Sequence, residues 1–174
     1  KSTGKQRGFE MEIRKLQSGE AAPMDLLLLA DPSEEMVQTY LATGDCYLAE
    51  DVERTVGVYV LSPIKKDTVE IMNVAVSEEF QGQGIGKKLI LDAIERARKL
   101  GYKTIEIGTG NSSIGQLALY QKCGFRISSI DKDFFIRNYN EAIFENGIQC
   151  RDMVRLSLNL DVIGTRFEGT KSEK

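Results

Sequence analysis

Residues 68–100 constrain the fold most, because an apolar run, a glycine-rich loop and an amphipathic pattern follow one another directly. The run "TVEIMNVAV" is rich in the apolar and β-branched side chains typical of a strand. Glycines then occupy positions 82, 84 and 86. A predicted helix over 85–100 ends before Gly101, a good C-terminal cap, and has one apolar face: Ile85, Leu89, Ile90, Ile94, Ala97 and Leu100.

A glycine loop that joins a strand to a helix is suited to bind an anion. The first N–H groups of a helix lack partners within the helix, the helix dipole is positive there, and glycines let an anion approach the backbone. The dinucleotide-binding pattern is excluded because Lys87 stands where its third glycine belongs. The nucleotide P-loop pattern is excluded by Gln81 and Lys88. The alternative is an ordinary glycine-rich turn.

The order of the other elements indicates the fold class. An alternating segment begins at Met11, and a polar turn is expected at residues 51–54 between two strands. The remaining elements are expected as helices over 25–30, 33–44 and 113–124, and strands over 45–50, 55–63, 103–110 and 150–158. This order predicts an α/β (α+β) fold, in which helices cover both faces of a mixed sheet.

The chain is predicted to form one domain over residues 11–158. The first ten residues, "KSTGKQRGFE", are polar and aperiodic, so we expect residues 1–10 to be a remnant added in cloning, with the native start at Met11. Residues 159–174 are expected to form a polar, loosely held tail.

The amino-acid composition excludes several kinds of active site and binding partner. The chain contains no histidine, which excludes Ser-His-Asp catalysis, a histidine base and histidine-ligated zinc, and no metal is expected. The net charge of −3 gives no general attraction for nucleic acid or anionic lipid, and no apolar run is long enough to span a membrane. Three cysteines without a secretory signal predict a reducing, cytoplasmic location.

Two motifs together resemble the GNAT superfamily of N-acetyltransferases. The loop from Gln81 to Gly86 fits Q/R-x-x-G-x-G/A, the coenzyme A pyrophosphate loop of that family. The segment from Asn111 to Phe125 resembles its later helix, which ends in the pattern L-Y-x-x-x-G-F. The resemblance covers residues 11–158 and implies a mostly antiparallel central sheet and acetyl-CoA as cosubstrate.

The resemblance also implies cofactor-binding residues. Asn111 lies nine residues before Tyr120, where seven is the commoner spacing, so either Asn111 or Ser113 is the expected pantetheine contact. The strand before the loop is expected to offer a backbone N–H to the thioester carbonyl. The full set is Val74, Ala75, Val76, Gln81, Gly82, Gln83, Gly84, Ile85, Gly86, Lys87, Asn111 and Ser113.

Catalytic roles follow from the same resemblance. Tyr120 is the expected general acid, because a phenol of pKa about 10 is protonated at neutral pH and can protonate the leaving thiolate. Glu70 is the expected base that takes the proton of the attacking amine. The alternatives are a packing tyrosine and an exposed or ion-paired carboxylate. Direct transfer is favoured over an acyl-enzyme, because no histidine activates Cys123 or Cys150.

The expected acceptor is a primary amine of a small molecule or peptide. Its pocket is assigned by resemblance to residues 31–40 and 131–147. The second segment places carboxylates among aromatic side chains, which suits a cationic amine, although a solvated acidic loop is the alternative. These carboxylates are Asp131, Asp133, Glu141 and Glu145. A homodimer is compatible with the exposed late strands, and a non-catalytic CoA-binding sensor is the alternative function.

Overall fold

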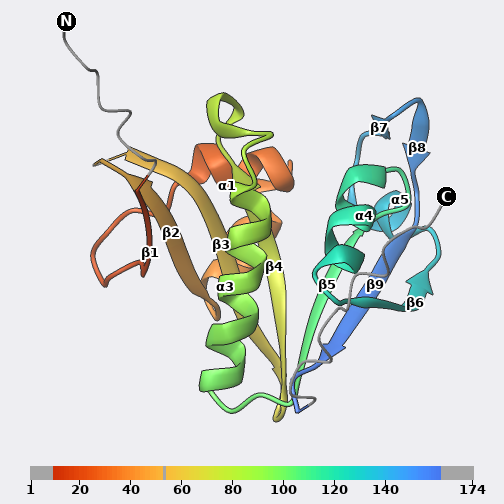
Figure 1. Ribbon diagram of the computed structural model, residues 1–174. Helices are drawn as coiled ribbons and strands as arrows, with labels where there is room; N and C mark the ends of the chain where they lie inside the picture. The colour runs from red at the N-terminus through yellow and green to blue at the C-terminus, as the bar shows by residue number, and fades with distance from the viewer. Residues whose placement is uncertain (1–9, 53, 162–174) are drawn as a thin grey trace, which may run out of the picture.

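A seven-stranded mixed sheet is the main element of the computed structural model, which describes residues 10–52 and 54–161 (Figure 1). The strand order is β1-β2-β3-β4-β5-β9-β6, and among the described strands only β4 and β5 pair in parallel. The strands are β1 (Met11–Lys15), β2 (Asp45–Asp51), β3 (Arg54–Lys65), β4 (Thr68–Val76), β5 (Thr104–Gly110), β6 (Arg126–Asp131) and β9 (Met153–Asn159). The predicted mostly antiparallel sheet is confirmed.

Helices cover both faces of the sheet, as predicted, because successive strand side chains point to opposite faces. On β3, Tyr59 lies in the core that includes α3 and α4, whereas Val58 and Val60 lie in the core that includes α1 and α2. The helices are α1 (Met24–Ala30), α2 (Glu34–Leu41), α3 (Ile85–Lys99), α4 (Ile114–Lys122) and α5 (Phe134–Asn138).

Helices α3 and α4 both end in a glycine with left-handed backbone. At the end of α4, Gly124 has φ +102° and donates its N–H to the Gln121 carbonyl, while the N–H of Phe125 reaches the Tyr120 carbonyl at 3.1 Å. This is the Schellman arrangement, which satisfies the last carbonyls of the helix. It also folds Phe125 back, so that its ring centroid lies 6.5 Å from that of Tyr120. Gly101, with φ +87°, ends α3 in the same way.

The sheet opens between β4 and β5 (Figure 1). Residues 68–71 of β4 pair with residues 104–107 of β5, and the pairing stops there although both strands continue. At the same point the register of β4 against β3 shifts, which leaves Met72 as an extra residue. A bulge of this kind bends a strand and increases its twist. The bulge therefore accounts for the divergence of β4 from β5.

The region between α4 and β9 contains more structure than the sequence indicated. It includes β6, α5 and a separate hairpin of β7 (Ile143–Glu145) and β8 (Ile148–Cys150). The domain also extends past residue 158, since Asn159 ends β9 and Leu160 is buried. Residues 1–9 and 162–174, on which the expected remnant and most of the expected tail fall, lie outside the described residues. None of the described helices is long and apolar enough to cross a membrane.

Candidate active site

Two adjoining cavities lie between the diverging strands. The loop cavity, of about 240 Å³, lies beside the glycine loop and is lined by residues 74–76 of β4. The hairpin cavity, of about 280 Å³, is lined by residues of α5, β7 and β8 and by residues 107–110 of β5. Five residues line both cavities: Leu29, Ala30, Val74, Gln116 and Tyr120. The cavities therefore meet where β4 faces α4.

The glycine loop presents free backbone donors beside the loop cavity. Gly82 and Gly84 have φ of +77° and +80°, a conformation that side chains disfavour. The backbone N–H groups of residues 84–87, at the start of α3, donate to no acceptor among the described residues. No acidic side chain lies in this first turn, and Lys87 adds positive charge. This is the environment expected of an anion site at a helix N-terminus.

The end of β4 is hydrogen-bonded to the glycine loop. The Gln81 side chain donates from Nε2 to the Val76 carbonyl at 3.0 Å, which ties the loop to the strand. Beyond residue 71, the only described strand that pairs with β4 is β3. Because alternate residues of a strand direct their N–H and C=O groups to opposite edges, the β5-facing N–H groups of the segment from Val74 to Val76 have no strand partner along the loop cavity. Gln83 is exposed at the loop tip, whereas the Ile85 side chain is buried in the core.

Tyr120 lies at the junction of the two cavities. The residue is only 4% exposed, and its hydroxyl has no hydrogen-bond partner among the described residues. Burial, followed by the nearby Cys123, raises the pKa of Tyr120 above its ordinary value. The phenol is therefore protonated at neutral pH and free to donate its proton to a group in the cleft.

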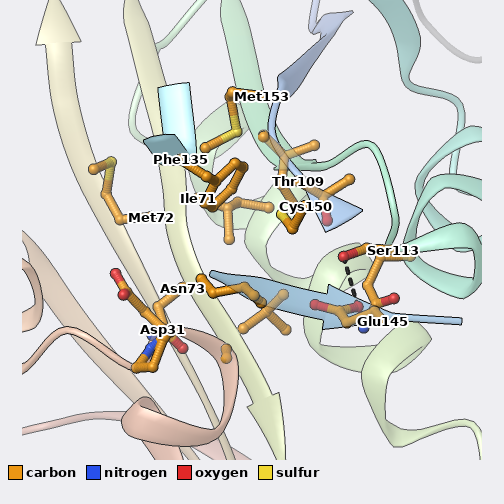
Figure 2. A pocket seen from close by; sticks show the side chains of 18 of the residues that line it. Asp31, Ile71, Met72, Asn73, Thr109, Ser113, Phe135, Glu145, Cys150 and Met153 are labelled. Atoms are coloured by element: carbon orange, nitrogen blue, oxygen red, sulfur yellow. Dashed lines mark hydrogen bonds between the residues drawn. The ribbon is translucent and has the colours of Figure 1, made fainter. Parts of the chain in front are cut away.

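Two carboxylates line the hairpin cavity from opposite sides (Figure 2). Asp31, at the end of α1, accepts the hydroxyl of Tyr139 at 2.9 Å. Glu145, on β7, accepts the hydroxyl of Ser113 at 2.9 Å. Beside Asp31, the Asn73 side chain is buried and donates from Nδ2 to the Leu27 carbonyl and the Tyr40 hydroxyl. This cavity is thus acidic and partly aromatic.

Comparison with known proteins agrees with this geometry. The family model described as "Acetyltransferase (GNAT) family" matches residues 13–125. The chain belongs to the GNAT acetyltransferase family.

Similar GNAT proteins cover most of the chain. The "Uncharacterized N-acetyltransferase YvbK" of Bacillus subtilis is 65% identical over 78% of this chain and 88% of its own length. A GNAT acetyltransferase from Elizabethkingia anophelis, solved with acetyl-CoA bound, is 52% identical with a TM-score of 0.84, covering 86% of this chain and 97% of that one. A Bacillus subtilis acetyltransferase solved with CoA is 59% identical with a TM-score of 0.82, covering 86% and 99%. The predicted GNAT fold and acetyl-CoA-dependent acyltransferase activity are confirmed.

The structure does not bring Glu70 to the GNAT cleft. Glu70 lies on β4, opposite Glu106 of β5, and lines neither cavity. Its carboxylate accepts from Arg155 Nη1 at 3.3 Å. Burial raises the pKa of Glu70, an effect that Arg155 opposes and Glu106 reinforces. A catalytic role for Glu70 would therefore need water between the carboxylate and the amine.

The two candidate pantetheine residues differ in availability. The Asn111 side chain is occupied by backbone groups, because its Oδ1 accepts from the N–H groups of Arg151 at 2.8 Å and Asp152 at 3.0 Å, and its Nδ2 donates to the Gln149 carbonyl at 3.1 Å. Ser113 lines the hairpin cavity and donates to Glu145. The β5–α4 loop therefore fixes the β7–β8 hairpin.

Most of the acidic side chains predicted for the acceptor pocket lie elsewhere. Asp131 forms an ion pair with Arg137, and Asp133 forms one with Arg151. Glu141 is exposed and does not line either cavity, so among the four only Glu145 reaches the site. Asp31 was not singled out from the sequence, although it begins the early segment that was assigned to the pocket. Nothing in its local pattern distinguishes it from other carboxylates that precede a helix.

The cysteines do not favour an acyl-enzyme. Cys150 lines the hairpin cavity, but burial raises its pKa, and burial also raises the pKa of Cys123. Since the thiolate is the nucleophilic form, both shifts lower reactivity. Among the described residues there is no group of three or more side chains that could bind a metal ion.

Proposed function

We propose that this GNAT enzyme transfers the acetyl group of acetyl-CoA directly to a primary amine of a small molecule or peptide. The observation that carries the proposal is the Tyr120 hydroxyl, which lies at the junction of the loop and hairpin cavities and has no hydrogen-bond partner in the described part of the chain. A phenol placed there can serve both reactants at once. A similar protein of known structure, the "IAA acetyltransferase" from Bacillus cereus, is 53% identical, and its name gives an acetyltransferase activity for that protein.

The loop cavity is suited to the cosubstrate. The pyrophosphate would accept hydrogen bonds from the free N–H groups of residues 84–87, with Lys87 adding positive charge. Gly82, Gly84 and Gly86 have no side chain that could obstruct this contact. A free N–H of the segment from Val74 to Val76 would donate to the thioester carbonyl and stabilise the negative charge that develops on its oxygen. Ser113 then remains the candidate side-chain contact for pantetheine.

The hairpin cavity would present the amine to the same carbonyl. The amine nitrogen forms a bond to the carbonyl carbon, the C–S bond breaks, and Tyr120 donates its proton to the departing sulfur. The proton lost from the amine passes to a base, and water then restores the proton of Tyr120. The base is either water or, through water, Glu70.

The test is direct detection of acetylated amine. The protein is incubated with acetyl-CoA labelled in its acetyl group and with a panel of small amines and peptides, and the products are separated and counted. Label is expected in an amine product in amounts equal to the CoA released. If CoA binds but no amine of the panel gains label, the proposed acceptor class is wrong. The predicted homodimer and the absence of a nucleic-acid partner stay predictions.

A further inference from the structure

We infer that the acceptor is a small amine with a second cationic group, and that Asp31 binds this second group. The inference rests on the proposed function, because it names the acceptor class for the same site. It starts from the charge of the hairpin cavity, whose lining, among the residues that the structure describes, contains Asp31 and Glu145 and no Lys or Arg. Neither carboxylate has an ion-pair partner among the described residues. The cavity is therefore negative and uncompensated.

Asn73 provides an independent sign of a missing donor. The residue is 4% exposed and lines the hairpin cavity beside Asp31 (Figure 2). Its amide orientation is fixed, because the carbonyl of Leu27 can only accept and so must face Nδ2, at 2.9 Å. The Oδ1 atom consequently has no hydrogen-bond partner among the described residues. A buried carbonyl oxygen left without a donor is costly. Because Oδ1 itself has almost no exposed surface in this structure, an ammonium group bound beside Asp31 would supply the donor once the side chains of the cavity wall shift to admit it.

Asp31 is oriented to receive that ammonium. Its Oδ1 accepts from the Ser33 N–H at 3.0 Å and the Tyr139 hydroxyl at 2.9 Å, while its Oδ2 has only a long contact of 3.4 Å with the Tyr40 hydroxyl. One oxygen is thus held in place and the other has capacity left. The aromatic rings of Tyr139 and Phe135 also line this cavity, and aromatic faces attract cations.

The positions of Asp31 and Tyr120 explain why the acceptor needs two nitrogens. Tyr120 lines both cavities, whereas Asp31 lines only the hairpin cavity, so the reacting atoms and the anchor lie apart. The reacting nitrogen must lose its charge before it attacks, and an uncharged amine gains little from a carboxylate. A second amine that stays protonated is attracted to the carboxylate both before and during the reaction. Glu145, on the opposite side, further disfavours an acceptor that carries a carboxylate.

Three acceptors of equal chain length test the inference: diaminobutane, butylamine and the four-carbon ω-amino acid. They differ only at the fourth carbon, which carries an ammonium group in the diamine, is a plain methyl group in butylamine and is the carboxylate carbon in the amino acid. We expect kcat/KM for the diamine to exceed that for butylamine by at least about tenfold, since a charged hydrogen bond is at stake, and the amino acid to be poorest. Equal kcat/KM for the three would overturn the inference and leave the proposed function intact.

Two variants test whether Asp31 causes the preference for the diamine over butylamine. Asp31→Asn keeps the size and an acceptor oxygen for Ser33 and Tyr139 but removes the charge, so the preference for diamine over butylamine should fall to about twofold or less. Glu141→Gln removes one charge from the same acceptor-side region outside both cavities, and it should keep the wild-type preference. An unchanged preference in Asp31→Asn would assign the specificity elsewhere.

Calorimetry separates this inference from the proposed function. If no amine is acetylated, diaminobutane is titrated into the protein saturated with CoA. Binding that weakens at least about tenfold in Asp31→Asn would support the cation site although catalysis has failed. No binding of the diamine to the wild type would overturn the inference.

Discussion

Tyr120 is buried, and its hydroxyl has no hydrogen-bond partner in the described structure. A substitution that removes only this oxygen therefore tests its role in catalysis without breaking another interaction. In Tyr120→Phe the ring keeps its packing against Phe125, and no partner among the described residues loses a hydrogen bond. We expect kcat to fall by about 10²-fold, roughly 3 kcal/mol of barrier, because general acid catalysis contributes about 10²- to 10⁴-fold and water partly replaces the phenol. Steady-state kinetics with a verified amine measures this.

The control is cofactor affinity, which calorimetry should find within about twofold of wild type. A wild-type kcat in Tyr120→Phe, under conditions where chemistry limits turnover, would remove Tyr120 from the mechanism. The raised pKa of Tyr120 adds a constraint on the wild type. Loss of activity through deprotonation of this phenol should not begin below about pH 10, the ordinary tyrosine value.

Glu70 should affect the pH dependence of stability. Its pKa is raised in the folded protein, chiefly by burial, so the folded state binds a proton more tightly than the unfolded state does. The stabilisation from this proton is complete below the unfolded pKa and is lost as pH rises through the folded pKa. Thermal unfolding of wild type and Glu70→Gln from about pH 4 to pH 7 should therefore show the wild type losing stability relative to the variant.

Kinetics of the same variant address catalysis. Because Glu70 lies outside both cavities, Glu70→Gln separates a structural carboxylate from a base that acts through water. A loss of about 10²-fold in kcat with a folded variant would assign Glu70 the role of base. A loss below about threefold would leave water as the base.

At the scale of elements, the start of α3 can be tested without disturbing the helix. Gly86 has ordinary helical backbone, and a Cβ there would only touch Leu119 and Val76 at 3.7 and 3.9 Å. In Gly86→Asp, the carboxylate suits the helix dipole but lies where we place the pyrophosphate. CoA affinity should fall at least tenfold, about 1.4 kcal/mol, by calorimetry.

Gly86→Asn is the matched control for this change, because it has the same shape without the charge. It should weaken CoA binding much less than Gly86→Asp. Equal affinities for the two variants would mean that charge at this helix end does not matter. Gly84 is unsuitable for the test, since its φ of +80° would strain any side chain.

The β7–β8 hairpin should depend on Asn111. Asn111→Ala removes three hydrogen bonds to residues 149–152 and leaves two backbone N–H groups and one carbonyl without them. Stability should fall by about 1–3 kcal/mol in denaturant unfolding. Because Glu145 and Cys150 lie on this hairpin, KM for the amine should rise while CoA affinity is kept. A change in CoA affinity alone would return Asn111 to the role of pantetheine contact.

The elements that the sequence predicted well are those whose period matches one buried face. Residues 85–100 show this for helices, and the glycine at 101 marks the end that the structure confirms. The segment 126–150 was missed because β6 has exposed residues on both faces and β7 and β8 have three residues each. Such strands are specified by their partners rather than by local pattern. The role of Asn111 was also hidden from local pattern. Its hydrogen-bond partners lie 38 to 41 residues away in the sequence, so the sequence alone suggested a ligand contact.

At the scale of the whole molecule, binding of the cosubstrate should stabilise the fold. A ligand that binds only the folded state at about 100 times its Kd adds about 2.7 kcal/mol to the free energy of unfolding. For a chain of 174 residues this corresponds to a rise in Tm of roughly 5–11 °C. Scanning calorimetry should show this rise with CoA and acetyl-CoA, and no rise with NAD or ATP at the same concentration. No response to millimolar CoA would contradict the assignment of the loop cavity.

The opening of the sheet could not be predicted from the sequence. The run over residues 68–76 keeps its alternation of buried and half-buried side chains throughout, including the extra residue at Met72. A bulge depends on the register against a neighbouring strand, which a local pattern does not specify. The sequence could therefore locate the phosphate loop and Tyr120, but not the cleft between them.

The pairing of Asp131 with Met153 has a consequence for how this protein could change. Since the end of β6 and the start of β9 are neighbours, residues 132–152 form an insertion at the tip of a two-stranded unit. A short turn could close that unit without shifting the register of any other strand. The segment that carries Glu145 and Tyr139 is thus exchangeable as a cassette, whereas the glycine loop is built into the central strand–helix joint. Laboratory or natural recombination of this segment can change the wall of the hairpin cavity that faces Asp31 and leave the cosubstrate site unchanged.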